Sequence, residues 1–367
     1  MLLWLIHSLA PLLEKLELIS SAERRAFLTT RTALASLTSF LIAICLGPFA
    51  IRWLKSRFRE RIASDSARLN ELHAGKSSTP TMGGLLILGS LLTAILLWCD
   101  LTNRYVQVAI FTIVGFGTLG AGDDWIKLRT TRKGLSVREK LIGQILLGGC
   151  VSTVLFIHQY SVPHGLELTL PFLSQPISLG WAFIPWSTLV IVALSNAVNL
   201  TDGLDGLAGG CMVFTGSAAV ALTYLAGHRV LAEYLRIPYL PGCGEFSVVL
   251  GATVGAVLGF LWFNCHPAQV FMGDTGSLPL GSLLAVGAIA TRQELLIGIA
   301  SGVFIVETLS VICQVGWFKL TRKRLIACSP LHNHYLFRGQ HETKIVIRFW
   351  IVAALLAIVS VALVKLH

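Results

Sequence analysis

The chain has 367 residues, of which 54% are hydrophobic and only 13% are charged, and its formal net charge is +10. Soluble domains carry about a quarter charged residues, so a mean hydropathy of +0.73 excludes an ordinary soluble protein. The basic residues fall in the connections between apolar runs, and we expect no nucleic acid among the partners.

Seven apolar runs approach the roughly 20 residues that a helix needs to cross the hydrocarbon core of a bilayer, and with three further runs the predicted spans number ten. A membrane-spanning segment must satisfy its own backbone hydrogen bonds, which favours helices for runs of this length. The predicted spans cover residues 29–51, 82–98, 106–122, 140–157, 181–198, 206–226, 246–263, 276–291, 295–317 and 346–366. The sequence therefore predicts an all-α, polytopic integral membrane protein with about ten transmembrane helices in one domain, residues 29–367.

The first 28 residues are a separate N-terminal segment. They contain many apolar residues but lack the basic start and the clear small-residue cleavage site of a signal peptide. This pattern predicts an amphipathic interfacial segment rather than a signal peptide. The eight cysteines are scattered and form no C-x-x-C motif, so we interpret them as small apolar residues and not as disulfides or zinc ligands.

The distribution of lysine and arginine predicts how the chain is oriented across the membrane. Twenty of the 29 basic residues lie in three odd-numbered connections, at 52–81, 123–140 and 318–348. By the positive-inside rule these connections are cytoplasmic, and both termini are then extracytoplasmic. The local positive charge suits anionic lipid headgroups or phosphorylated substrates, although topology alone would also produce it.

Polar residues gather in five odd-numbered connections, all on the predicted cytoplasmic side. They are Asp123 and Asp124 after the third span, Asn199, Asp202 and Asp205 after the fifth, Asp274 after the seventh, His332 and His334 after the ninth, and Lys76 before the second. Ionisable groups at membrane depth are costly and mark functional sites. The convergence predicts one cytoplasm-facing active-site cleft.

The residue types indicate the chemistry of this cleft. Aspartates with few basic residues at their own depth favour a hard cation held by oxygen, with Mg²⁺ the first candidate. Nearby lysines, namely Lys76, Lys127, Lys133 and Lys140, suit a phosphate-bearing substrate. Carboxylates, magnesium and lysines together are the parts of a phosphoryl-transfer site.

Each element also has a simpler structural interpretation. An Asp-Asp pair could end a helix in solvent, the aspartates of DGLDG could form a turn, and Asp274 could cap the next helix. The histidines could lie in a surface loop, and Glu307 could be a structural hydrogen-bonding acid or line a pathway. All five polar connections are predicted to lie on the same side of the membrane, and this favours a single functional site.

Six segments carry a resemblance to a known family. They are HAGKSSTPTMGG (73–84), GDDWIK (122–127), SNAVNLTDGLDGLA (195–208), GFLWFNCHPAQVFMGDTGSL (259–278), VFIVETLSVICQVGWFK (303–319) and SPLHNHY (329–335). Over almost its whole length the chain resembles the polyprenyl-phosphate N-acetylhexosamine-1-phosphate transferase superfamily, and within it the branch that makes lipid I. The resemblance implies ten helices, Mg²⁺ dependence, a homodimer and a place in the bacterial cytoplasmic (inner) membrane. The implied reaction joins UDP-N-acetylmuramoyl-pentapeptide to undecaprenyl phosphate and releases UMP, the first membrane step of peptidoglycan synthesis.

The resemblance also implies residue roles. Asp274 would ligate magnesium with Asn199, and Asp123 would accept the proton of the lipid phosphate, with Asp124 beside it as a further catalytic acid. Phe271 would stack on uracil and Gln314 would lie in the nucleoside pocket. The remaining substrate-binding residues would be Lys76, Thr81, Lys127, Lys140, Asn199, Asp202, Gly203, Leu204, Asp205, Ser277, His332 and His334.

One motif departs from the family pattern. Three consecutive histidines are usual, followed after tyrosine by an acid, but here Asn333 replaces the middle histidine and Leu336 the acid. A role that needs the charge of the middle imidazole is therefore not expected. His332 and His334 are candidates for phosphate or peptide contacts.

Several alternatives remain at the level of the sequence. The reaction could be direct displacement or pass through a phospho-aspartate. The donor could instead be UDP-N-acetylglucosamine, although the HNHY, TPTMGG and NLTDGLDGLA segments argue against it. A transporter or lipid flippase would place its acids near the bilayer midplane rather than at one interface.

Overall fold

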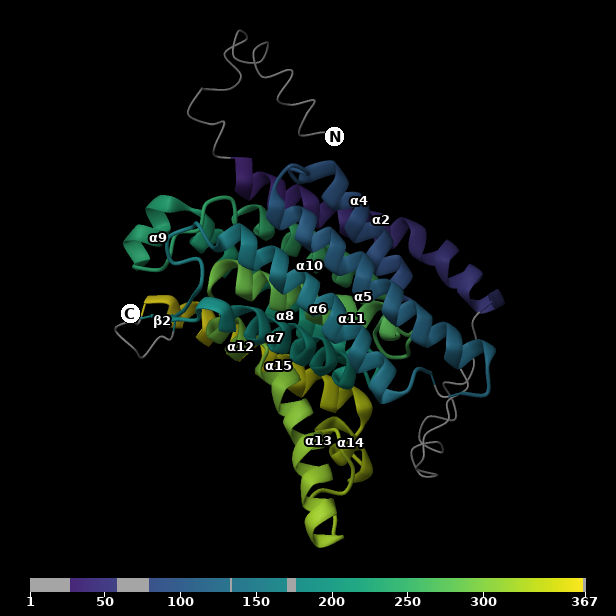
Figure 1. Cartoon of the computed structure of the whole chain (residues 1–367). Helices are drawn as coiled ribbons and strands as arrows, with labels where there is room; N and C mark the ends of the chain where they lie inside the picture. The colour runs from purple at the N-terminus through teal and green to yellow at the C-terminus, as the bar shows by residue number, and fades with distance from the viewer. Residues whose placement is uncertain (1–26, 58–78, 133, 170–175, 366–367) are drawn as a thin grey trace.

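The computed structural model describes residues 27–57, 79–132, 134–169 and 176–365, which are almost entirely helical (Figure 1). The long helices are α2 (Phe27–Arg57), α4 (Gly84–Trp98), α5 (Arg104–Arg129), α6 (Val137–Gln159), α7 (Phe183–Thr201), α8 (Leu207–Gly227), α10 (Glu245–Asn264), α11 (Asp274–Thr291), α13 (Gly302–Thr321) and α15 (Glu342–Ala362). The short elements are β1 (Glu167–Leu168), β2 (Ile177–Ser178), η3 (Gly180–Ala182), α9 (Arg229–Leu235), α12 (Glu294–Ala300), α14 (Leu331–Phe337) and η4 (Leu363–Lys365). The two strands pair antiparallel, an exception to the predicted all-α structure.

Most of the predicted spans correspond to helices. In the part of the chain that the structure describes, eight helices are long and apolar enough to cross a membrane: α2, α5, α6, α7, α8, α10, α13 and α15. The span predicted at 82–98 is α4, which has only 15 residues, and the one at 276–291 is α11, which is buried inside the protein. The total of about ten spans and the placement of both termini stay predictions. The interfacial segment 1–28 lies almost wholly outside the described residues.

The ninth predicted span, 295–317, is wrong as one continuous helix. The structure has two helices there, α12 and α13, which are separated at Ser301. Serine–glycine pairs interrupt helices readily, and Gly302 follows the break. Beyond it α13 extends away from the helix bundle (Figure 1), and its only buried side chains are Val303, Phe304 and Glu307.

Helix α11 is the centre of the bundle. All 18 of its residues are buried, and it packs against α4, α5, α7, α8 and α12. Glycines allow backbone to approach its first turn directly: a Cβ on Gly84 would lie 2.2 Å from Gly276 N, and one on Gly120 would lie 2.2 Å from Asp274 O. The entry to α4 is joined to the segment before α11 by hydrogen bonds from Gly83 N and Gly84 N to the carbonyls of residues 271 and 272, both 2.8 Å.

The opposite end of α11 is fixed by a buried polar cluster. Arg292 is fully buried, and its guanidinium lies 4.5 Å from the centroid of the Phe183 ring. It donates hydrogen bonds to Glu294 at 3.2 Å and to the side chain of Gln159, which in turn donates to the hydroxyl of Tyr105. The cluster therefore ties the end of α11 to α5, α6 and α7, because a buried charge is tolerated only when paired and hydrogen-bonded.

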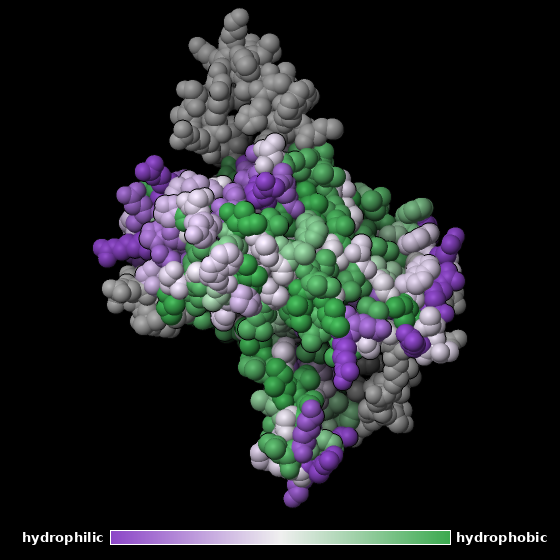
Figure 2. Space-filling model, viewed as in Figure 1, coloured by the Kyte–Doolittle hydropathy of each residue, from purple (hydrophilic) through white to green (hydrophobic). Residues whose placement is uncertain are grey.

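The surface agrees with a protein surrounded by lipid. Apolar side chains cover the middle of the face shown in Figure 2, and hydrophilic side chains lie toward its margins. Large apolar residues are exposed on several helices that could span a membrane, such as Leu146 on α6, Leu189 on α7, Ile312 on α13 and Ile358 on α15. A contiguous apolar exterior of this kind is costly in water and favourable in a bilayer.

The glycine contacts at the start of α11 generate a stability prediction. We expect Gly120→Ala to lower the thermal denaturation midpoint of the detergent-solubilised protein by several degrees, because its Cβ meets backbone atoms of Asp274 and Thr275 that have no flexible end to move. Overpacking of this kind costs roughly 1–3 kcal/mol. Gly122→Ala is the matched control on the same helix, since a Cβ there meets nothing within 4 Å. Equal midpoints for the two variants would contradict the tight α5–α11 contact.

Candidate active site

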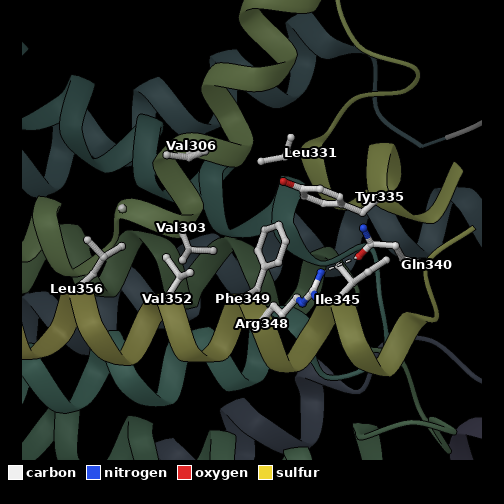
Figure 3. A pocket seen from close by; sticks show the side chains of 11 residues that line it. Val303, Val306, Leu331, Tyr335, Gln340, Ile345, Arg348, Phe349, Val352 and Leu356 are labelled. Atoms are coloured by element: carbon white, nitrogen blue, oxygen red, sulfur yellow. Dashed lines mark hydrogen bonds between the residues drawn. The ribbon is translucent and has the colours of Figure 1, made fainter. Parts of the chain in front are cut away.

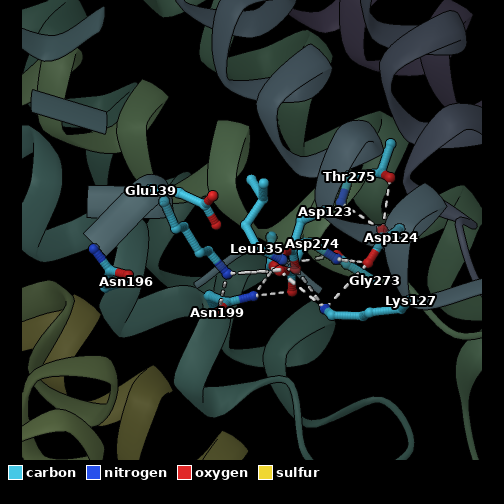
Figure 4. Close-up of polar contacts among 12 residues, drawn as sticks. Asp123, Asp124, Lys127, Leu135, Glu139, Asn196, Asn199, Gly273, Asp274 and Thr275 are labelled. Atoms are coloured by element: carbon cyan, nitrogen blue, oxygen red, sulfur yellow. Dashed lines mark hydrogen bonds and ion pairs between the residues drawn. The ribbon is translucent and has the colours of Figure 1, made fainter. Parts of the chain in front are cut away.

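Three aspartates, Asp123 and Asp124 of α5 and Asp274 of α11, meet at the N-terminal end of α11 (Figure 4). One carboxylate oxygen from each lies within 4.8 Å of the others, and the residues are 3%, 2% and 7% exposed. We call them the three-acid cluster. Buried carboxylates this close repel one another unless opposite charges lie between them, so the cluster depends on its neighbours.

Two lysines supply that opposite charge. The Nζ of Lys127 lies 2.7 Å from Asp123 Oδ2 and 3.1 Å from Asp274 Oδ2. The Nζ of Lys140, on α6, lies 2.5 Å from the same oxygen of Asp274. Three carboxylates and two ammonium groups leave one uncompensated negative charge, which favours a further cation. The structure thus brings both predicted lysines to the acids, and their contact with a diphosphate stays a prediction.

Asn199, near the end of α7, holds the third acid in position. Its Nδ2 donates to Asp274 Oδ1 at 2.6 Å and to Ser277 Oγ at 2.8 Å, and its Oδ1 accepts from Lys140 at 3.3 Å. Ser277 in turn donates to Gly273 O at 3.0 Å. The predicted metal ligand Asn199 and the predicted substrate residue Ser277 therefore both lie beside Asp274.

Asp123 is held by the connection that follows α5. The backbone N–H of Leu135 donates to Asp123 Oδ1 at 2.6 Å. This approach requires Gly134, whose φ is +102° and whose Cβ would lie 2.7 Å from the same oxygen. Neither contact was found from the sequence, although a glycine close to a functional acid is a usable signal. Asp123 keeps its second oxygen for Lys127.

Asp124 has a different environment. It accepts hydrogen bonds from the backbone N–H groups of Asp274 and Thr275, at 3.2 and 2.9 Å, and from the Thr275 hydroxyl at 2.7 Å. These groups are the first donors of α11, whose own preceding residue, Gly273, provides no side-chain cap. A carboxylate at a helix N-terminus satisfies free N–H groups and stabilises the positive end of the helix dipole. Asp124 thus caps α11 from another helix, and its predicted role as a catalytic acid stays a prediction.

The loop between α7 and α8, residues 202–206, places its two aspartates differently. Asp202 is half-buried at the end of α7, Gly203 is exposed, and Leu204 is buried in the core. Asp205 belongs to a second group of potential ligands, with His266 and Glu342, and not to the three-acid cluster. The sequence predicted a shared side for these acids, and the structure separates them into two groups within the described residues.

The second group joins three segments. Asp205 Oδ2 lies 3.0 Å from His266 Nδ1 and accepts from Ala268 N at 3.1 Å. Glu342, at the start of α15, accepts from Asp205 N at 2.9 Å. These contacts hold the 202–206 loop to the α10–α11 connection and to α15. The sequence reasoning missed His266 and Glu342, although His266 lies inside the quoted segment 259–278.

Two predicted residues lie at the segment that pairs with the entry to α4. Thr81 is buried beside Gly273, where a Cβ would lie 3.1 Å from its Oγ1. Phe271 is half-buried, and its backbone N–H donates to Pro80 O at 2.8 Å. Their predicted contacts with diphosphate and uracil stay predictions. Lys76 and Lys133 lie outside the described residues.

The residues after the ninth predicted span form another group. Gln314 Oε1 accepts from Leu325 N and Ile326 N, both 3.0 Å, and His334 Nδ1 accepts from Ala327 N at 3.1 Å. Both side chains therefore shape the connection between α13 and α14, and their predicted substrate contacts stay predictions. His332 lies in α14, 1% exposed, so it is not in a surface loop.

The two departures from the family motif have different surroundings. Leu336 packs against the hydrophobic core, a position where an apolar side chain is accommodated without cost. The Oδ1 of Asn333 is buried and has no hydrogen-bond partner in the described part of the chain. Nothing in the structure explains the asparagine.

A pocket of about 260 Å³ lies between α13, α14 and α15 (Figure 3). Its lining is mainly apolar, and Val303, Val306 and Val352 are typical of it. Arg348 lies at one side, where its Nη1 donates to Gln340 Oε1 at 3.2 Å. Its lining includes none of the three-acid cluster, so it is a separate apolar feature of the same protein.

The three-acid cluster has the composition of a site for a hard cation. All its ligand atoms are carboxylate oxygens, they converge from two helices, and the cluster carries residual negative charge. Oxygen-only ligand sets suit Mg²⁺, Ca²⁺ or Mn²⁺ rather than zinc. Buried acidic groups that could hold a metal ion are thus present where the sequence predicted them.

Comparison with known proteins identifies the family. The model of "Glycosyl transferase family 4" matches residues 106–292, which include the three-acid cluster and Asn199. A phospho-N-acetylmuramoyl-pentapeptide-transferase of Thermodesulfovibrio yellowstonii is 44% identical over 345 residues, 93% of this chain and 94% of that protein. The protein of the same name from Pelobacter propionicus is 43% identical over 367 residues, 99% of this chain and 100% of that one. The one from Geobacter sp. (strain M21) is 45% identical over 366 residues, with coverage of 99% and 100%. The chain therefore belongs to glycosyl transferase family 4 and, within it, to the phospho-N-acetylmuramoyl-pentapeptide-transferases.

Proposed function

We propose that the protein transfers phospho-N-acetylmuramoyl-pentapeptide from UDP-N-acetylmuramoyl-pentapeptide to undecaprenyl phosphate, which gives lipid I and UMP. The observation that carries this proposal is the buried three-acid cluster with Lys127 and Lys140 against Asp274. The relatives' names support the donor, and the apolar exterior supports a substrate that stays in the bilayer. The reaction would take place at the cytoplasmic face of the bacterial inner membrane, in a homodimer.

Magnesium is the metal that the proposal requires. Asp274, with the oxygen of Asn199, would hold the ion. When bound, Mg²⁺ neutralises negative charge on the diphosphate and on the leaving group. The lysine ammonium groups at 2.5 and 3.1 Å from Asp274 Oδ2 would then turn to phosphate oxygens, because a divalent ion compensates the carboxylates in their place.

The chain's own residues would position the reactants for direct displacement. An oxygen of the lipid phosphate forms a bond to the β-phosphorus of the donor, the bond from that phosphorus to the bridging oxygen of UMP breaks, and UMP leaves with the electron pair. Asp123 accepts the proton when the lipid phosphate arrives as its monoanion, or, when its own carboxyl is protonated, donates a hydrogen bond that holds the phosphate dianion in place. Asp124, through its hydrogen bonds to the first turn of α11, keeps Asp274 at a fixed depth. Catalysis of this type depends mainly on positioning and charge.

The apolar pocket between α13 and α15 supports the lipid half of the proposal. Its valine- and leucine-rich lining offers an isoprenoid chain a surface similar to hydrocarbon. A transported soluble solute would gain nothing from such a lining.

Release of UMP tests the function. We expect the purified protein in detergent, with Mg²⁺ and undecaprenyl phosphate, to release UMP from UDP-N-acetylmuramoyl-pentapeptide and not from UDP-N-acetylglucosamine. A chelator should stop the release and added Mg²⁺ should restore it, because the acids would lose the cation that balances the diphosphate. Release from UDP-N-acetylglucosamine alone would move the protein to the polymer-priming branch, and no release from either donor would favour transport.

A substitution tests the site. Asp274→Asn should lower the rate of UMP release by roughly 10²-fold or more, because it removes a charged ligand at the centre of the cluster. Asp100→Asn is the control, since that aspartate lies in the α4–α5 connection and accepts from Thr102. Thermal denaturation of both variants checks folding. A wild-type rate for Asp274→Asn at saturating magnesium would refute the assignment.

Isotope exchange tests the order of bond changes. Direct displacement predicts that labelled UMP does not enter UDP-N-acetylmuramoyl-pentapeptide unless the lipid acceptor or its product is present. A phospho-aspartate route would allow exchange without any lipid, because the first half-reaction would be reversible on its own. Exchange in lipid-free detergent at a rate comparable to turnover would replace direct displacement with the two-step route.

A further inference from the structure

Glu307 is a buried acid that the proposed reaction does not use. It lies one turn into α13 and is fully buried, whereas most of that helix is exposed. Its Oε1 accepts from the backbone N–H of His332 at 3.1 Å, and its Oε2 lies 3.2 Å from His332 Nδ1. Both carboxylate oxygens are thus directed at one residue of α14.

These contacts determine where the imidazole carries hydrogen. An ionised carboxylate only accepts hydrogen bonds, so the nitrogen that faces it must be the donor. His332 therefore carries a hydrogen on Nδ1. A second hydrogen, on Nε2, would be a buried donor without an acceptor, and that costs more than an unused lone pair. The hydrogen bonds therefore favour a ring that carries hydrogen on Nδ1 and leaves Nε2 bare.

The bare Nε2 is an unexplained acceptor. It is buried, and among residues 27–57, 79–132, 134–169 and 176–365 it has no hydrogen-bond partner. Buried polar atoms without a partner are rare in native proteins, and each one needs an explanation.

The surroundings of Nε2 indicate which ligand it would meet. A Cβ on Gly203 would lie 2.3 Å from this atom, so the ring occupies the side-chain position of that glycine. Gly203 itself is exposed, so the ring lies directly against a glycine at the protein surface. It also lies between Asp202 and Leu204, in the loop that leads from Asn199 of the active site. A glycine backbone moves with little steric resistance.

The neighbouring residues place this junction next to the apolar pocket. Val306 and Leu331, which directly precede Glu307 and His332, line that pocket from α13 and α14 (Figure 3). The Glu307–His332 pair therefore lies between the pocket proposed for the lipid and the loop proposed for the donor.

We propose that Glu307 is a positioning residue for the donor substrate: it fixes His332 with hydrogen on Nδ1, so that Nε2 accepts a hydrogen bond from a hydroxyl or amide N–H of the UDP-sugar when the Gly203 backbone moves off the ring. This inference rests on the proposed function for the identity of the donor. A purely structural pair would have the same tautomer, so the distinction is the response of Nε2 to the donor substrate.

Glu307→Gln is the decisive variant, because it keeps the shape of the side chain and changes its hydrogen-bonding pattern. The backbone N–H of His332 has a fixed hydrogen and takes the amide oxygen, so the amide NH₂ faces Nδ1. The ring then has to accept at Nδ1 and carry its hydrogen on Nε2. The variant thus converts the acceptor into a donor without removing the imidazole.

The first measurement is ¹⁵N NMR of histidine-labelled protein in detergent, with the His332 ring assigned by its loss in His332→Gln. We expect Nδ1–H and bare Nε2 in the wild type, a shift of the Nε2 resonance when UDP-N-acetylmuramoyl-pentapeptide is added, and hydrogen on Nε2 in Glu307→Gln. Hydrogen on Nε2 in the wild type, or an Nε2 resonance that does not respond to the donor, would overturn the inference even if Glu307→Gln fails to fold.

The second measurement is the affinity for UDP-N-acetylmuramoyl-pentapeptide by calorimetry. We expect Glu307→Gln to weaken it about tenfold or more, as loss of one buried hydrogen bond does, with KM for undecaprenyl phosphate unchanged. Thr308→Val is the matched control, because within the described residues Thr308 Oγ1 donates only to its own helix, at Phe304 O. An equal donor affinity in both variants, with only a lower melting temperature in Glu307→Gln, would reduce the pair to a structural contact.

The two proposals fail separately. Donor binding that depends on Glu307 without any release of UMP would refute the transferase function and retain the positioning role. Release of UMP at the wild-type rate and affinity in Glu307→Gln would refute the positioning role alone.

Discussion

The arrangement of the active site depends on how the first turn of α11 is held. Asp124 accepts hydrogen bonds from Asp274 N, Thr275 N and the Thr275 hydroxyl, so a side chain of α5 performs the capping that Gly273 cannot. A helix end buried without such partners would be unstable. Glycines at 84 and 120 bring the backbones of α4 and α5 onto the same turn. The position of Asp274 is thus fixed by backbone contacts that tolerate almost no adjustment.

This geometry has an electrostatic cost, which is repulsion among the carboxylates that it brings together. The contacts that cap α11 also place three carboxylates within a few ångströms of each other in a buried site, where their mutual repulsion is weakly screened. Lys127 and Lys140 compensate two of the three charges. The remaining charge, on an oxygen-only set of ligands, gives the cluster a composition that suits a divalent cation. A site optimised for stability alone would use fewer acids.

The sequence predicted the helices and the meeting of the acids for physical reasons. Apolar runs of about 20 residues are detected by composition alone, and alternate connections must share a membrane side. This reasoning brought Asp124 and Asp274 together although 150 residues separate them in the sequence.

Other features could not be predicted from the sequence. Composition does not reveal where a helix is interrupted, so the break at Ser301 was missed. Topology also says nothing about side-chain direction within a loop, so Asp205 was grouped with acids that it does not join. The Glu307–His332 pair depends on how α13 and α14 pack, which no local pattern encodes.

The C-terminal elements hold the loop that the central helices present. Gly206 N donates to Asn264 Oδ1, while Gly206 O accepts from Trp350 Nε1, and Asp205 N donates to Glu342 Oε1. Gly206, in the left-handed region at φ +77°, begins α8 without a side-chain cap, and its N–H and carbonyl are bonded to other elements instead. The family match covers residues 106–292, which contain the three acids, whereas Glu307, His332, Glu342 and Trp350 all lie beyond it. Residues beyond the matched segment therefore share with Asn264 and His266 inside it the holding of the 202–206 loop, and the C-terminal helices contribute to the position of that loop without supplying an acid of the three-acid cluster.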